Sequence, residues 1–356
     1  MREAAGVLVP LQNAERTIRT LRKLKLIDET LQFTRTREGL IIPLIHEPAP
    51  EELTAIREQC GNLTAQRTWF EESKRNPRDL KEALQSKIPA ESISMLPTSF
   101  DVIGDVAIVE LPEGLSQYGS MIGAGILSLN PRIRLVLKKM SETSGRFRTR
   151  QFQAIAGPGT TETLYTEFSC RYHLDVAKVY FNPRLSHERM RVAQQVQPGE
   201  RVLDMFAGVG PYSILIAKKQ PEAEVHSIDV NPDAYRYLTE NVFLNKVADR
   251  VIPMLGDARD LVETNLRGKA TRVIMNLPAE AWKFVDVAVD ALSEQGGVLH
   301  YYTFASRMDR IEDLMNTFRS AVESQRRKVP EFKFCRPIRE VAPNRVQIAI
   351  DAQVKR

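Results

Sequence analysis

Asp204-Met-Phe-Ala-Gly-Val-Gly-Pro-Tyr-Ser213 joins a buried strand to a helix, and the rest of the sequence can be placed around it. Residues 201–206 predict the strand, residues 207–210 a tight turn, and Pro211 the first turn of the helix. In such a turn, glycines let the backbone approach a nucleotide-like ligand, and the acid at the strand end faces it. A dinucleotide-binding turn would carry a third glycine where this chain has Ser213, so the turn alone does not identify the ligand.

The composition predicts a globular protein of two or three domains. The chain has 356 residues, 43% of them hydrophobic, which is enough for at least one large core. No run approaches the roughly 18 apolar residues that a membrane helix requires, and Met1-Arg-Glu lacks the charged and then apolar pattern of a leader. We therefore expect a cytoplasmic monomer that has no contact with membranes.

Neither a metal site nor a disulfide is expected from the cysteines. Cys60, Cys170 and Cys335 are far apart, and the sequence has no C-x-x-C pair and no cluster of cysteines and histidines. The formal net charge is +5 and the pI is about 9.0, which favours an acidic partner only weakly in a chain of this length. The positions of the basic residues are therefore more informative than their sum.

The N-terminal part predicts a small α+β domain over residues 1–70. Residues 5–45 show the order strand, helix, strand, strand, with an alternating stretch at 24–33 as the second strand. Residues 51–76 show little core pattern and predict a linker with some helix. We therefore expect the domain boundary near residue 70.

A middle α+β domain is expected over residues 71–165, and it carries a basic patch. Residues 131–150 include seven basic residues and a single acidic one. On a strand, Arg146, Arg148 and Arg150 would point the same way and suit a row of phosphates. The alternative is a solvated edge strand that its charges keep from aggregating. The RNA-binding residues predicted from this patch and from the stretch after residue 178 are Arg132, Arg134, Lys138, Lys139, Arg146, Arg150 and Arg184.

From residue 195 onward the sequence predicts an open, mostly parallel sheet with helices on both faces. The expected strands cover 201–206, 224–230, 250–255, 272–277 and 298–304, and the expected helices cover 211–219, 232–245, 279–293 and 306–326. Two further strands, 331–336 and 345–354, form a terminal hairpin, which is typical of class I methyltransferases rather than of NAD domains. The expected fold class is α/β, with a class I, Rossmann-like S-adenosylmethionine methyltransferase sheet over residues 166–356.

Polar residues recur at the carboxyl ends of the expected strands, where the ligand of such a sheet lies. Asp204, Asp229 and Asp257 follow the first three strands, and Asn276 follows the fourth. An acid after the second strand can accept hydrogen bonds from ribose hydroxyls, one after the third from an adenine amine, and Asp204 can hold a methionine ammonium. Each acid alone would more often cap a helix. In this order they fit S-adenosylmethionine, and NAD is less favoured because of Ser213.

Two further stretches carry candidate chemistry. Asn276-Leu-Pro278 is similar to the Asn/Asp-Pro-Pro-aromatic turn of amino methyltransferases, but it lacks the aromatic ring, which disfavours adenine N6 and cytosine N4 as targets. Glu188 lies between Arg184 and Arg191. It is either a salt-bridged helical acid or, if it is desolvated near the cofactor, a general base. The sequence leaves both interpretations open.

Several of these stretches together resemble one family, the archaeal and eukaryotic tRNA (guanine-N1)-methyltransferases that act on guanosine 37. The resemblance rests on Ser99-Phe-Asp-Val-Ile-Gly-Asp-Val-Ala-Ile108, Lys178-Val-Tyr-Phe-Asn-Pro-Arg-Leu185 with Glu188, residues 204–210, and Val273-Ile-Met-Asn-Leu-Pro278 followed by His300-Tyr-Tyr302. It covers nearly the whole chain, including the small N-terminal unit. It implies methyl transfer from S-adenosylmethionine to guanine N1, with tRNA bound through its outer corner and its anticodon loop.

The resemblance also implies roles for individual residues. Glu188 matches the general base that removes the N1 proton, and Arg148 matches the arginine that stabilises O6 as negative charge develops. Asn276 and Pro278 match the turn that orders the base and the donor methyl, and Tyr180 matches an aromatic residue near the guanine. The cofactor-binding residues expected from the turn and the family pattern are Arg189, Asp204, Phe206, Gly208, Gly210, Asp229, Val230, Asp257, Ala258 and Asn276. The scheme requires no metal.

Two alternatives stay open. A related wyosine-pathway transferase uses the same fold to move an aminocarboxypropyl group, or a methyl group in a dual role, onto a modified guanosine 37. The turn at Asn276 and the acid Glu188 favour methyl transfer to guanosine. A non-catalytic tRNA-binding protein with a relic cofactor fold is disfavoured by the intact acids after three strands.

Overall fold

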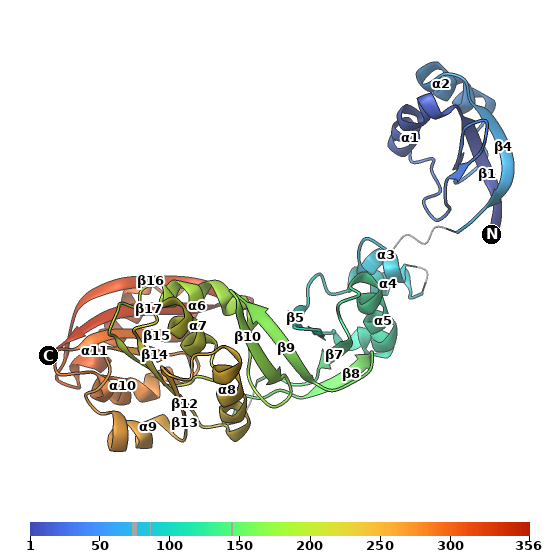
Figure 1. The fold of residues 1–356 in the computed structure, drawn as a ribbon. Helices are drawn as coiled ribbons and strands as arrows, with labels where there is room; N and C mark the ends of the chain where they lie inside the picture. The colour runs from blue at the N-terminus through green and yellow to red at the C-terminus, as the bar shows by residue number, and fades with distance from the viewer. Residues whose placement is uncertain (73–76, 86, 144) are drawn as a thin grey trace. The chain divides into compact units, whose positions relative to one another are not determined.

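The structure, a computed structural model, describes residues 1–72, 77–85, 87–143 and 145–356, which divide into two units, Met1–Arg78 and Asp79–Arg356 (Figure 1). Each unit has hydrophobic clusters that contain residues of that unit alone. Each therefore has the interior of an independently folding domain. In the described ranges, no helix is both long and apolar enough to cross a membrane.

The first unit is a four-stranded antiparallel sheet with two helices on one face. Its strands, in spatial order, are β2 (Thr34–Arg35), β3 (Leu40–Pro43), β1 (Arg2–Val9) and β4 (Thr64–Phe70). A 3-10 turn (Leu11–Asn13) precedes α1 (Ala14–Lys23), and α2 is Pro50–Cys60. Val7, Leu21 and Ile56 bury the contact between β1 and the two helices. Alternate residues of β1 thus form the core, as period-two patterning predicts.

Two sequence predictions for this unit are wrong. The expected helix in residues 51–70 is present as α2, but these residues are not a linker, because Ile56 and Cys60 lie in the core and β4 pairs with β1 along its whole length. Such backbone pairing leaves little trace in hydrophobic periodicity. The last part of the expected linker, residues 73–76, lies outside the described residues. Residues 24–33 do not form a strand, because Lys25 has φ of 57° and Asp28 closes a side-chain turn.

The second unit begins with a four-stranded sheet that helices cover on one face. Its strands, in spatial order, are β5 (Asp101–Ile103), β6 (Val106–Val109), β7 (Leu135–Lys139) and β8 (Phe152–Ala156). The helices are α3 (Leu80–Leu84), α4 (Ala90–Ser94), η2 (Glu113–Tyr118) and α5 (Gly119–Leu129). Gly104, at φ 60°, turns β5 into β6 as the sequence predicts. The other face of the sheet, including Val106 and Leu137, joins the hydrophobic cluster of the C-terminal part.

The C-terminal part is the predicted doubly wound sheet with a terminal hairpin. In spatial order its strands are β13 (Val251–Leu255), β12 (Glu224–Asp229), β11 (Arg201–Asp204), β14 (Arg272–Met275), β15 (Gly297–Ser306), β17 (Arg345–Lys355) and β16 (Lys328–Ala342). The first five are parallel and the last two antiparallel. The hairpin of β9 (Glu162–Glu167) and β10 (Cys170–Asp175) precedes the sheet. The predicted fold class is confirmed.

Helices cover both faces of this sheet. α6 (Ser186–Ala193), α7 (Pro211–Lys219) and α8 (Pro232–Leu244) pack in the cluster on one face. α9 (Ala258–Leu261), α10 (Val285–Ala291) and α11 (Ile311–Glu323) pack in the cluster on the other. Shorter helical turns are η3 (Pro183–Leu185), η4 (Val262–Leu266) and η5 (Ala281–Phe284). The turns at the carboxyl ends of the parallel strands are left open between these layers.

The basic strand predicted around residues 146–150 does not form. Residues 145–148 form turns, with Gly145 at φ 71° and Arg148 at φ 57°, and β8 begins only at Phe152. A residue in the left-handed region cannot continue a strand. The three arginines therefore do not form a row, and two of them bind separate partners.

Candidate active site

The turn after β11 holds the acid at the end of β12 in a fixed orientation. Gly208 has φ of 55°, which glycine adopts without strain, and its N–H donates to Asp229 Oδ2 at 2.7 Å. The N–H of Asn231 donates to Asp229 Oδ1 at 2.8 Å. Burial raises the pKa of the Asp229 carboxyl, and these backbone hydrogen bonds oppose the shift. Gly210, the residue before α7, has φ of 89°, and a Cβ atom there would meet Leu238 at 2.5 Å.

A cavity of about 460 Å³ lies at the carboxyl ends of the parallel strands. This volume is within the range of small-molecule sites. Most of the predicted catalytic and cofactor residues line it, namely Arg148, Tyr180, Phe206, Gly208, Asp229, Val230, Asp257, Ala258, Asn276 and Pro278, together with Arg146 from the basic patch. Folding therefore brings together predicted residues that are up to 132 positions apart in the sequence (positions 146 and 278).

The cavity wall fits S-adenosylmethionine. Each oxygen of Asp229 keeps a second lone pair for a ribose hydroxyl. Asp257 caps α9 with one oxygen, and its other oxygen accepts Arg146 Nη2 at 3.1 Å, so the acid faces the cavity in addition to capping a helix. Asn276 Oδ1 is buried and has no hydrogen-bond partner among the described residues. Because an unpaired buried acceptor is costly, Asn276 fits a ligand that brings a donor.

Asp204 is fully buried and is not among the residues that line the cavity. Ser213, which stands where a dinucleotide turn has its third glycine, donates its hydroxyl to Asp204 Oδ2 at 2.8 Å. Asp204 Oδ1 has no partner in the described part of the chain, and burial raises the pKa of the carboxyl to about 7. The contact expected between Asp204 and a methionine ammonium is thus not pre-formed and stays a prediction.

Glu188 and Arg189 also lie outside the cavity lining, in buried ion pairs. Arg189 donates to both oxygens of Glu167 at 2.6 Å. Arg191 donates to both oxygens of Glu188 at 2.8 and 2.7 Å, and the Tyr302 hydroxyl donates to the same carboxylate at 2.6 Å. The salt bridge that the sequence suggested for Glu188 is therefore present.

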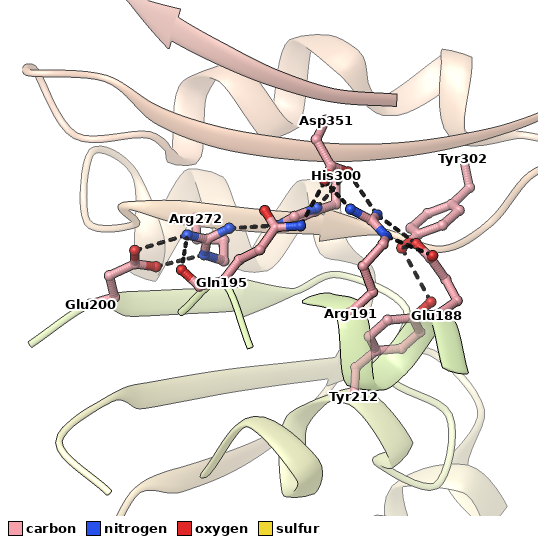
Figure 2. A network of polar contacts seen from close by, with 9 residues as sticks. All are labelled: Glu188, Arg191, Gln195, Glu200, Tyr212, Arg272, His300, Tyr302 and Asp351. Carbon is pink, nitrogen blue, oxygen red and sulfur yellow. Dashed lines mark hydrogen bonds and ion pairs between the residues drawn. The ribbon is translucent and has the colours of Figure 1, made fainter. Parts of the chain in front are cut away.

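Glu188 is part of a polar network that extends across the sheet from Tyr212 to Glu200, as Figure 2 shows. Arg191 pairs with Asp351 on β17, and His300 Nδ1 contacts Asp351 at 2.7 Å. Arg272 lies 2.7 Å from His300 Nε2. Because Arg272 can only donate, Nε2 accepts and the Nδ1–H group donates to Asp351. Burial lowers the pKa of His300, which favours this neutral form. The network fixes α6 to β14, β15 and β17.

The arginines at positions 146, 148 and 150 have different surroundings. Arg146 pairs with Asp257 at 3.1 Å, and Arg150 donates to Thr143 at 2.7 Å. The guanidinium of Arg148 has no hydrogen bond or ion pair with any described residue, and Arg148 lines the cavity. Of the three, Arg148 is therefore the one that lines the cavity with no protein partner for its guanidinium.

Most of the other basic residues expected to contact RNA have partners within the protein. Arg134 donates to Asp105 at 3.0 Å and to three backbone carbonyls. The other pairs are Lys138 with Ser116, Lys139 with Glu110 and Glu142, and Arg184 with Asp101. Arg132 is exposed. Of the set, Arg132 is the residue whose side chain has no hydrogen bond or ion pair with any described residue.

Sequence reasoning missed several side chains that line the cavity, among them Leu185, Phe284, Phe304 and Gln347. Phe304 on β15 lies directly opposite Gln347 on β17. Opposed residues of an antiparallel pair share a face, so the terminal hairpin supplies part of the cavity wall. Alternation along a strand does not distinguish a side chain in a core from one in a cavity.

Comparisons with known proteins identify the family. Residues 163–330 match the TRM5/TYW2 methyltransferase domain, residues 80–160 the TYW2 N-terminal domain, and residues 6–52 the tRNA methyltransferase 5 N-terminal domain. Trm5b of Pyrococcus abyssi, a tRNA (guanine(37)-N(1))-methyltransferase, is 40% identical over 98% of this chain and 98% of its own length. The chain belongs to the Trm5 family.

Solved structures of this family agree with the assignment. The crystal structure of Pyrococcus abyssi Trm5b matches with a TM-score of 0.72 and 39% identity, over 99% of this chain and 100% of that one. The complex of aTrm5 and tRNALeu matches with a TM-score of 0.73 and 30% identity, over 98% and 99%. The Trm5 family consists of S-adenosylmethionine-dependent tRNA methyltransferases, so the predicted enzyme class and cofactor are confirmed.

The Trm5 family is also related to wyosine-pathway enzymes. The tRNA 4-demethylwyosine(37)-methyltransferase Taw21 of Saccharolobus solfataricus is 34% identical over 70% of this chain and 92% of its own length.

Proposed function

We propose that this Trm5-family protein methylates N1 of guanosine 37 in tRNA. The observation that carries the proposal is the single cavity that brings Asp229 and Asp257 together with Arg148, Tyr180 and Asn276. The two acids suit the nucleoside half of S-adenosylmethionine, and the other three residues suit a base. When bound, S-adenosylmethionine supplies an electrophilic methyl group at its sulfonium.

The target atom explains why the base side of the cavity is polar. Guanine N1 carries a proton and is a poor nucleophile until a base removes it and a cation stabilises the charge that develops on O6. Arg148 is the proposed cation, because its guanidinium is unpaired, whereas Arg146 and Arg150 bind other residues. The buried, unpaired Oδ1 of Asn276 supports a contact with an N–H group of the base. Tyr180 and Pro278 flank the same space.

Glu188 is the proposed acceptor of the N1 proton. Leu185 lines the cavity, and Glu188 follows it by three residues, on the same side of the helical turn. The carboxylate would leave one of its bonds to Arg191 to reach the base, while the Tyr302 hydroxyl continues to orient it. Hydrogen bonds of catalytic groups commonly align only when the substrate is present.

A methyl-transfer assay tests the reaction. Transcripts of one tRNA that differ only in guanosine or adenosine at position 37 are incubated with the protein and methyl-labelled S-adenosylmethionine, and the product nucleosides are identified. We expect label at N1 of guanosine 37. Equal labelling of the two transcripts, or label at another atom, contradicts the proposal.

The role of Glu188 is tested by Glu188→Gln, which keeps an acceptor for Tyr302 but removes the base. We expect single-turnover methyl transfer to slow roughly 100- to 10,000-fold, the range for a lost general base, with little change in S-adenosylmethionine affinity. Tyr302→Phe is the matched control, because it removes an orienting bond and leaves the carboxylate, and it should slow transfer only about tenfold. If Glu188→Gln weakens cofactor binding and leaves the single-turnover rate intact, Glu188 is structural.

The division of labour along the chain is also a proposal. Residues 1–70 inspect the outer corner of tRNA, and residues 166–356 act on the anticodon loop. The middle domain over 71–165 is joined to the catalytic domain. The match of residues 6–52 to the tRNA methyltransferase 5 N-terminal domain supports the first part. The similarity over 98% of this chain to the aTrm5 structure with tRNALeu supports tRNA as the partner of the whole protein.

A second activity, methylation of a modified guanosine 37, is favoured by two observations. Residues 80–160 match the TYW2 N-terminal domain, and Taw21, a tRNA 4-demethylwyosine(37)-methyltransferase, is 34% identical. The assay above, repeated with a tRNA that carries 4-demethylwyosine at position 37, tests it. Methylation at a rate similar to that of guanosine 37 would support the dual role, and no methylation would restrict the enzyme to guanosine.

A further inference from the structure

We infer that Gln347 donates a hydrogen bond to O6 of the target guanine and so selects guanine over adenine. The inference rests on the proposed function and adds a residue of β17 to the site. Among the described residues, four buried side-chain atoms have no hydrogen-bond partner, and two of them, Asn276 Oδ1 and Gln347 Nε2, belong to residues that line the cavity. One is an acceptor and the other a donor. A ligand that carries both a donor and an acceptor on one edge can pair with these two atoms.

The orientation of the Gln347 amide is fixed by its neighbour. The residue is 1% exposed, and its Oε1 accepts the Nε–H of Arg339 at 3.0 Å. A guanidinium has no acceptor, so the amide oxygen must face Arg339 and the NH2 group must take the other position. Gln347 lines the cavity, its NH2 group is buried without a partner among the described residues, and leaving that donor unpaired is costly. The ligand atom that meets it is therefore an acceptor.

The order of the strands places this donor on the base side of the site. Asp229 and Asp257 follow β12 and β13, which lie on one side of β11 and β14. Gln347 is on β17, two strands beyond β14 in the opposite direction, and it faces the same way as Phe304 on β15. Asn276, at the end of β14, stands between the two halves. The donor is thus separated from the acids that suit the cofactor.

The donor and acceptor match guanine and mismatch adenine. Guanine presents the O6 acceptor next to the N1–H donor, and adenine presents an amine at position 6 next to an N1 acceptor. Gln347 Nε2 can meet O6 while Asn276 Oδ1 meets an N–H group of the same edge. O6 has two lone pairs, so Arg148 can donate to it as well. With adenine, the amide donor would face another donor, and a site that leaves a buried polar group unpaired rejects its ligand strongly.

The variant Gln347→Glu tests the assignment, because it retains an oxygen for Arg339 and nearly the same volume but replaces the donor by an acceptor. We expect kcat/KM for the guanosine-37 transcript to fall roughly tenfold to a hundredfold. The ratio of affinities for the guanosine-37 and adenosine-37 transcripts, measured with S-adenosylhomocysteine bound, should shrink by a similar factor. Gln353→Glu is the matched control: Gln353 lies on the same strand outside the cavity lining, donates to the Gly297 carbonyl, and should leave the ratio unchanged.

A guanosine analogue identifies the acceptor atom. A transcript with 7-deazaguanosine at position 37 keeps O6 and lacks N7, so Gln347→Glu should lose as much on this transcript as on guanosine. If the loss disappears, the donor meets N7, and the assignment to O6 is wrong. Circular dichroism checks that the variant folds, and Gln347→Leu, which removes the amide without adding charge, provides a second variant with the same expected loss of discrimination.

Two outcomes separate this inference from the proposed function. An unchanged affinity ratio in a folded variant, or a fall in S-adenosylmethionine affinity that accounts for the whole loss of kcat/KM, overturns the role of Gln347. If the wild-type protein does not methylate guanine N1 but binds the guanosine-37 transcript more tightly in a manner that depends on Gln347, the proposed reaction is wrong and the inference stands.

Discussion

Asp204 is a fully buried acid at the end of β11, and its burial gives a pH signature. Burial raises the pKa of the carboxyl from 3.8 to about 7. Since the folded pKa lies above the unfolded one, the unfolded chain releases this proton first, and stability falls as pH rises from about 4 through about 7. In the cofactor-free protein, Asp204→Asn should therefore raise the free energy of unfolding at pH 8 by up to about 4 kcal/mol, roughly three pH units at 1.36 kcal/mol each.

Urea unfolding of both proteins at pH 4.5 and pH 8 measures this effect. The free energies of unfolding of the two proteins should differ little at the lower pH, where the buried carboxyl keeps its proton, and most at the higher pH. A difference that is the same at both pH values would contradict a raised pKa of the Asp204 carboxyl. A fall in S-adenosylmethionine affinity in the same variant would support the expected contact between Asp204 and the methionine ammonium.

Arg132 and Arg134 are two residues apart, yet their contacts predict different phenotypes. Arg132 is exposed, so Arg132→Ala should weaken tRNA binding and reduce the slope of log K against log salt by about 0.7 to 0.9, the value for one phosphate contact. Arg134 binds Asp105 and three carbonyls, so Arg134→Ala should lower the free energy of unfolding by about 1–3 kcal/mol. Filter binding at several salt concentrations and urea unfolding separate the two. The reverse pattern would show that the arginine contacts change when RNA binds.

At the scale of elements, the buried pair of Arg189 and Glu167 joins α6 to β9. The side chains are 2% and 5% exposed and share two hydrogen bonds of 2.6 Å. Arg189→Met leaves an unpaired buried charge, so we expect a loss of about 3–5 kcal/mol in the free energy of unfolding. The double variant with Glu167→Leu should recover much of that loss, because both charges are then gone.

The same variants decide whether Arg189 contacts the cofactor, as the family pattern implies. If its role is to hold α6 on β9, S-adenosylmethionine affinity should recover in the double variant together with stability. If stability recovers and cofactor affinity does not, Arg189 acts on the cofactor directly. Calorimetric titration of the three proteins measures the affinities.

The elements that sequence predicted well are those whose burial has a regular period. The five parallel strands and the terminal hairpin formed as expected because buried runs and helix starts such as Pro211 and Pro232 alternate along the chain. The basic strand failed because Arg148 takes a left-handed conformation, which a sequence of alternating residues does not reveal. β4 was missed because backbone pairing with β1, rather than a hydrophobic pattern, makes it a strand.

At the scale of the whole molecule, the residues of the site also divide into those that the sequence could predict and those that it could not. Residues that end parallel strands, such as Asp229 and Asn276, could be predicted because topology alone brings strand ends together. Gln347 could not, because β17 is buried along nearly its whole length and only its pairing with β15 brings this side chain to the cavity. The buried partners of Glu188 were likewise hidden, since Arg191 and Tyr302 meet it only through the packing of α6 on the sheet.

The division into Met1–Arg78 and Asp79–Arg356 leads to a prediction for the whole protein. The hydrophobic clusters of the second unit contain no residue of the first, so a protein beginning at residue 79 should keep its unfolding midpoint in urea within about 10% of the value for the second transition of the full chain. Because the cavity lies wholly in the second unit, the shortened protein should methylate a short anticodon stem-loop at a rate within about threefold of the full chain. It should lose the preference for full-length tRNA with an intact outer corner.

Single-turnover rates on stem-loop and full-length transcripts measure both effects. Loss of folding in the shortened protein would contradict the independence of the two units, and an unchanged preference for full-length tRNA would show that residues 1–78 do not inspect it.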